Sequence, residues 1–92
     1  MDKELQELQK KVNEVHSRVD VLFNTAKIPT MLMNEYKNKV SQYENMIESV
    51  EMMKNMAKTD EAVQQLIFQQ KEILNKRIKC EMELARKAQS CL

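Results

Sequence analysis

Glycine is absent from this chain of 92 residues, and proline and aromatic residues are scarce. The chain contains one proline, two phenylalanines, two tyrosines and no tryptophan. The absence of glycine excludes phosphate-binding P-loops and the Rossmann dinucleotide fingerprint, because both motifs require glycines. It also disfavours hairpin-rich β folds, whose tight turns depend on glycine. Strong helix formers dominate instead, so the composition predicts an all-α protein.

Long hydrophobic runs are also missing, since the longest contain only three residues, at 21–23, 31–33 and 66–68. A membrane-spanning helix needs about 20 apolar residues and a signal-peptide core about 7–15, so neither is predicted. Fifteen Lys and Arg balance 14 Asp and Glu. This balance makes nucleic acid or an anionic membrane an improbable partner. We expect a cytoplasmic or nuclear protein, in a reducing compartment, without a transmembrane segment.

The motifs of catalysis and metal binding are missing as well. His16 is the only histidine, and although Ser17 adjoins it and Asp20 follows one turn later, three residues on one helical stretch do not converge as a triad does. Cys80 and Cys91 lie 11 residues apart in one predicted helix, about 16 Å, which is too far for a disulfide. No Cys-x-x-Cys or His-Glu-x-x-His spacing occurs. The sequence therefore predicts a non-enzymatic protein without metal, cofactor or small-molecule substrate.

The first segment, about residues 2–27, carries a heptad pattern. Apolar residues recur at alternating spacings of four and three from Met1 to Ala26. This stripe of two positions in seven is narrow, which is typical of a coiled-coil seam. His16 lies beside it and is expected to face solvent or to contact another helix. The predicted interface seam of this segment comprises Leu5, Leu8, Val12, Val15, Val19 and Leu22.

Two further helices are predicted, at about 30–57 and 60–92. Pro29 disfavours the helical conformation at Ile28 and lacks the N–H that a helix interior needs, so it separates the first two segments. It can itself lie in the first turn of the second helix, or Thr30 can cap that helix. A kinked continuous helix is an alternative. Thr59 or Asp60 is a suitable N-cap for the last helix. The seam of the second helix comprises Tyr36, Val40, Tyr43, Ile47 and Val50, and that of the third comprises Val63, Ile67, Leu74, Ile78 and Ala85.

Polar residues, Gln70 and Glu81, occupy two further positions of the third seam. A second apolar stripe, which includes Leu66, Ile73 and Cys80, flanks this seam. The apolar face of the third helix is therefore wide enough to contact two neighbours.

The fold predicted from these patterns is an all-α, antiparallel hairpin or coiled coil of two to three helices, in which residues 1–92 form a single module that packs with other chains. A self-contained three-helix bundle is the alternative. The predicted function is a non-enzymatic coiled-coil assembly module that oligomerises or scaffolds a larger protein complex through homo- or hetero-oligomeric packing.

Two surface features suggest alternative functions. A methionine-rich patch, formed by Met46, Met52, Met53 and Met56, suits a helical adaptor that binds a partner helix, because methionine adapts to irregular surfaces. A basic face, formed by Lys76, Lys79, Arg86 and Lys87, suits contact with microtubules, lipid or nucleic acid. Glutamates alternate with the lysines, so a salt-bridged face exposed to solvent is the simpler interpretation of this stretch.

Overall fold

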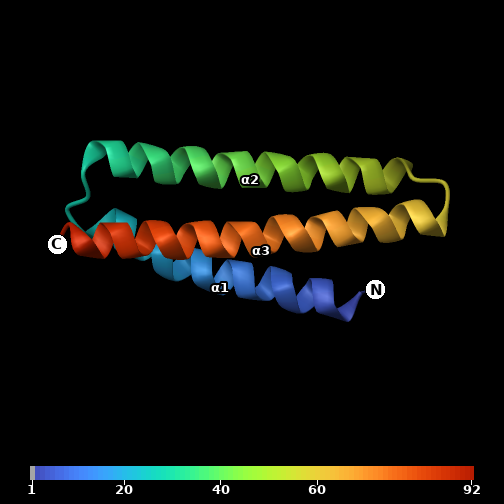
Figure 1. Cartoon of the computed structure of the whole chain (residues 1–92), viewed down its shortest axis with the longest axis horizontal. Coiled ribbons are helices and arrows are strands. Elements are labelled where there is room, and N and C mark those ends of the chain that lie inside the picture. Colours follow the sequence, from blue (N-terminus) through green and yellow to red (C-terminus); the bar gives the residue numbers. More distant parts are fainter. Residues whose placement is uncertain (1) are drawn as a thin grey trace.

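The computed structural model describes residues 2–92, which form three α-helices (Figure 1). Helix α1 spans Lys3–Thr25, α2 spans Thr30–Met56 and α3 spans Asp60–Ser90. The predicted all-α fold class is confirmed, and no helix end differs from its expected position by more than two residues. Met1, which the heptad pattern assigned to the seam, lies outside the described residues.

The helix ends follow from capping and from proline. The Asp2 carboxylate accepts a hydrogen bond of 3.0 Å from the Leu5 N–H at the start of α1. Thr59 caps α3 in the same way, through a 3.1 Å bond from the Ala62 N–H. The backbone is extended at Ala26, and residues 26–29 are not helical, so α1 and α2 are separate helices and not one kinked helix.

Helix α3 is the central element, because α1 and α2 both pack on it more extensively than on each other (Figure 1). Helix α2 runs antiparallel to α3, as the pairing of Lys54 with Gln70 and of Glu35 with Lys87 shows. Helix α1 runs parallel to α3, since its start lies beside residue 71 and His16 lies beside Glu81. The resulting molecule is long and flat, with extents of 50 × 22 × 15 Å.

The helices bury their apolar stripes against each other in two clusters. One cluster, at the end where all three helices meet, contains Val19, Phe23, Tyr36, Leu84 and Ala88. The other joins α1 to the middle of α3 and contains Leu5, Val12, Leu74 and Ile78. Every predicted seam residue is buried or half-buried within the chain. On α3, the seam residues Leu74 and Ile78 pack in a cluster with α1, and Cys80 of the second stripe packs against the cluster that contains Tyr36 of α2. The seams are therefore covered within the chain, as in the self-contained bundle.

Helix α1 is too short to cover the whole hairpin formed by α2 and α3. The Lys71 Nζ lies 3.1 Å from the Asp2 carboxylate and 2.9 Å from that of Glu4, so α1 begins beside the second quarter of α3. Beyond this point α2 and α3 continue as a pair, which we call the hairpin tip, residues 50–70 (Figure 1). Within residues 2–92, no helix combines the length and apolar character that crossing a membrane requires.

Candidate interaction surfaces

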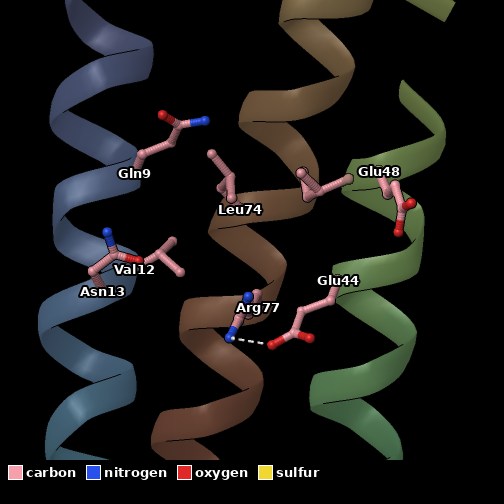
Figure 2. A pocket seen from close by; sticks show the side chains of 8 residues that line it. Gln9, Val12, Asn13, Glu44, Glu48, Leu74 and Arg77 are labelled. Atoms are coloured by element: carbon pink, nitrogen blue, oxygen red, sulfur yellow. Dashed lines mark ion pairs between the residues drawn. The ribbon is translucent and has the colours of Figure 1, made fainter. Parts of the chain in front are cut away.

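A buried polar cluster links the three helices near the middle of α3. Glu81 is only 2% exposed, and its carboxylate oxygens lie 2.6 Å from the His16 Nδ1 and 3.0 Å from the Arg77 Nε. Arg77 also extends toward Glu44 of α2, with 3.7 Å between Nη2 and Oε1 (Figure 2). Each charge in the cluster thus has a partner, as buried charges require. His16 is therefore an inter-helix contact, one of the two roles expected for it.

Tyr36 connects α1 and α2 next to this cluster. Its hydroxyl donates a 2.9 Å hydrogen bond to the Asp20 carboxylate, and its ring stacks on Phe23 with centroids 4.1 Å apart. Burial is the main cause that raises the pKa of Tyr36, and the hydrogen bond to Asp20 raises it further. The phenol therefore holds its proton through the neutral range and acts as a hydrogen-bond donor between helices.

The second polar position of the α3 seam, Gln70, is also satisfied internally. Its side chain is fully buried, donates to the Glu51 carboxylate at 2.5 Å and accepts from the Lys54 ammonium at 2.9 Å. Glu51 and Lys54 of α2 thus cover Gln70, which lies just beyond the start of α1. Sequence periodicity identified both polar seam positions, but their partners depend on which helices are neighbours.

A groove opens between α1 and α2, with α3 as its floor (Figure 2). It encloses about 290 Å³, and its rims carry Gln9 and Asn13 from α1 and Glu44 and Glu48 from α2. Of its apolar lining residues, Val12 and Leu74 are buried and Ile47 is half-buried. The exposed side chains of its lining, Asn13, Glu44 and Glu48, are therefore all polar, and two of them are charged.

All four methionines of the predicted patch are exposed, and two of them line one depression. Met53 and Met56 line a depression of about 340 Å³ at the hairpin tip, whereas Met46 and Met52 lie outside its lining. Met56 is 76% exposed. We call this the tip depression, and its full lining is Met53, Met56, Ala57, Ala62, Gln65, Leu66 and Gln69. No side chain in this lining is ionisable, although 32% of the residues of the chain are charged.

The predicted basic face is divided between two sides of α3. Lys76, Lys79 and Lys87 line a depression of about 330 Å³ between α2 and α3, together with Lys39 from α2. Arg86 instead lines a separate depression between α1 and α3. The sequence did not identify Lys39 as part of this basic surface, because the pattern along α3 does not show which residues of α2 lie beside it.

We call the first of these the basic depression, and its lining is Glu35, Lys39, Tyr43, Lys76, Lys79, Cys80, Glu83, Leu84 and Lys87. In this depression Lys87 forms an ion pair of 3.7 Å with Glu35 of α2, across the two helices and not along its own helix. Among the described residues, Lys39, Lys76 and Lys79 have no carboxylate within 4.0 Å. The surface therefore carries unpaired positive charge.

Chemically reactive groups are few on these surfaces. Burial raises the pKa of the Cys80 thiol, which is half-buried in the basic depression, so the thiol is a poor nucleophile at neutral pH. Cys91 is exposed, and both cysteines are free. Within residues 2–92, no three His, Cys, Asp or Glu side chains are grouped as a metal site would need.

Comparison with known proteins gives no relative. No protein-family model matches the chain, and no curated protein or solved structure is significantly similar to it. The chemistry of its surfaces is therefore the guide to its function.

Proposed function

We propose that the protein is a non-enzymatic assembly module, which holds a larger protein complex together by packing an exposed helical surface against another protein. The observation that carries this proposal is the tip depression. Its lining is mainly apolar and carries no charge, and α1, which begins beside Lys71, does not reach it. Contiguous apolar surface of this kind marks interaction sites in folded proteins, and methionine adapts to the shape of a partner.

The adaptor form of this function has more support than assembly through open heptad seams. The seam residues of α1, such as Val12 and Val19, are already buried against α3. A partner that used this seam would first have to displace a helix of the same chain. The tip depression requires no such displacement. The two free cysteines fit a reducing compartment, such as the cytoplasm or the nucleus.

The proposal is tested by the size of the complex that the protein forms in gentle extracts of the cells that express it. A fluorescently tagged copy should sediment as a discrete species, much larger than the 10.9 kDa chain. The double variant Met53→Glu/Met56→Glu should sediment as a monomer, because a charge buried in an apolar interface is costly.

Met31→Glu is the matched control, because Met31 is 86% exposed at the opposite end of α2. It introduces one carboxylate where the tip variant introduces two, and it should leave the complex intact. Circular dichroism of the purified variants checks that each one is folded. A wild-type protein that sediments as a monomer, or a complex that persists in the tip variant, would contradict the proposal.

A further inference from the structure

The tip depression and the basic depression lie on the same side of the hairpin. Both are lined only by α2, α3 and the residue that ends α2, with no contribution from α1. On α3, Gln69 of the tip and Lys76 and Glu83 of the basic depression follow one another at seven-residue intervals. Because seven residues make almost two whole turns, these side chains share one face of the helix.

Helix α2 shows the same alignment. Met53 lines the tip depression, Lys39 lines the basic depression, and the 38% exposed Met46 lies midway between them at seven residues from each. The two depressions are therefore parts of one surface, which we call the outer groove. Its lining on α3 runs from Ala62 to Lys87, over 25 residues, or about 38 Å at the rise of an α-helix.

The chemistry of the outer groove changes along its length. The tip depression has no ionisable lining residue, whereas the basic depression has four lysines and two glutamates, an excess of two positive charges. One lysine, Lys87, is neutralised by Glu35, and the other three have no ion pair among residues 2–92. A ligand that matches this surface is apolar at one end and negatively charged at the other.

The shape of the outer groove suits a helix. It lies between two nearly straight antiparallel helices, and an amphipathic helix in such a groove is a common form of peptide recognition (Figure 1). The Gln65 and Gln69 side chains line the tip depression and add hydrogen-bonding groups that do not select for charge. No aromatic side chain lies among the unpaired lysines except Tyr43, so stacking of nucleic acid bases has little support.

We infer that the outer groove binds an amphipathic helix of a partner protein, with apolar residues in the tip depression and carboxylates beside Lys39, Lys76 and Lys79. This inference rests on the proposed assembly function and adds the chemistry of the partner. The apolar end supplies most of the affinity, and the charged end fixes the position of the helix along the groove.

The test uses two synthetic, fluorescein-labelled peptides of about 25 residues, the helix length that spans the groove. Both have leucines on one face of one half. The other half has glutamates in the acidic peptide and lysines at the same positions in the basic peptide. Fluorescence anisotropy should show that the wild-type protein binds the acidic peptide about tenfold more tightly, since several exposed ion pairs contribute up to about 1 kcal/mol each.

Charge reversal on the protein provides the sharpest comparison. Lys76→Glu/Lys79→Glu should reverse the preference, so that the basic peptide binds more tightly than the acidic one. Lys10→Glu/Lys11→Glu changes the net charge equally but on the exposed surface of α1, and it should keep the wild-type preference. Met53→Glu should weaken the binding of both peptides.

Several results would overturn the inference. One is equal binding of the two peptides by the wild-type protein. Another is a change of preference in Lys10→Glu/Lys11→Glu as large as that in Lys76→Glu/Lys79→Glu. Binding of phosphatidylserine vesicles or of single-stranded RNA, lost in Lys76→Glu/Lys79→Glu, with no binding of the acidic peptide, would assign the lysines to phosphate groups instead. A native complex that persists in Lys76→Glu/Lys79→Glu but is lost in the tip variant would refute this inference and leave the proposed function in place.

Discussion

The contribution of the buried polar cluster to stability can be tested by replacing Glu81. Replacing it by leucine keeps a side chain of similar size but removes a partner from Arg77, which is only 10% exposed, and from His16, which is 31% exposed. Breaking a buried ion pair by removing one partner costs about 3–5 kcal/mol. Arg77 retains Glu44, and His16 has access to water, so we expect the lower end of this range, about 3 kcal/mol.

Urea unfolding followed by helical circular dichroism measures this loss. For a small domain the unfolding free energy falls by about 1–3 kcal/mol per molar urea, so the midpoint of Glu81→Leu should fall by about 1.5 M. Glu72→Leu, an exposed position on the same helix, is the matched control and should change the stability by no more than about 0.5 kcal/mol.

The double variant Arg77→Leu/Glu81→Leu separates the loss of charge pairing from the loss of packing. With both charges removed, no buried cation lacks its partner, and replacement of a buried pair by apolar residues is often neutral or stabilising. The double variant should therefore be more stable than Glu81→Leu alone. A double variant that is equally unstable, or less stable, would refute the view that Glu81→Leu loses stability because it leaves a buried cation unpaired.

Two other predictions concern the aromatic residues. Burial raises the pKa of Tyr36 and Tyr43, so as the pH rises past about 10 the unfolded chain loses these protons before the folded one, and stability should fall. Tyrosinate absorbance, uncomplicated by tryptophan, should report this late ionisation, and titration of both residues near pH 10 would contradict it. Phe23→Ala should destabilise the fold by about 3–5 kcal/mol in urea unfolding, because Phe23 is 1% exposed and stacked on Tyr36. A loss below about 1 kcal/mol would contradict the burial that the structure shows.

The helices and their ends could be predicted from the sequence because interactions between residues close in sequence determine them. Pro29 cannot continue a helix, and the Thr59 hydroxyl caps the first turn of α3 through a contact three residues away. The heptad seam of α1 was equally visible, since it depends only on spacing. Each of these signals involves residues within one or two helical turns.

The arrangement of the helices could not be predicted in this way, because it depends on contacts between residues far apart in sequence. The sequence predicted an antiparallel hairpin, and α2 and α3 form one, but nothing local indicated that α1 would lie parallel to α3. The pairing of Glu81 with His16 joins residues 65 positions apart. The basic depression likewise combines Lys39 with lysines of another helix. Packing of the seams with other chains stays a prediction.

The parallel course of α1 and α3 has a consequence during synthesis on the ribosome. Contacts between α1 and α3 join residues 65 and 67 apart, whereas those near the end of the α2–α3 hairpin join residues 16 and 19 apart. At a translation rate of about 5–20 residues per second, roughly 3–13 s pass between the synthesis of a residue of α1 and that of its contact in α3. An isolated helix of this length is marginal in water. The narrowness of its seam therefore limits the apolar surface that the nascent chain exposes to its neighbours while α3 is still being made.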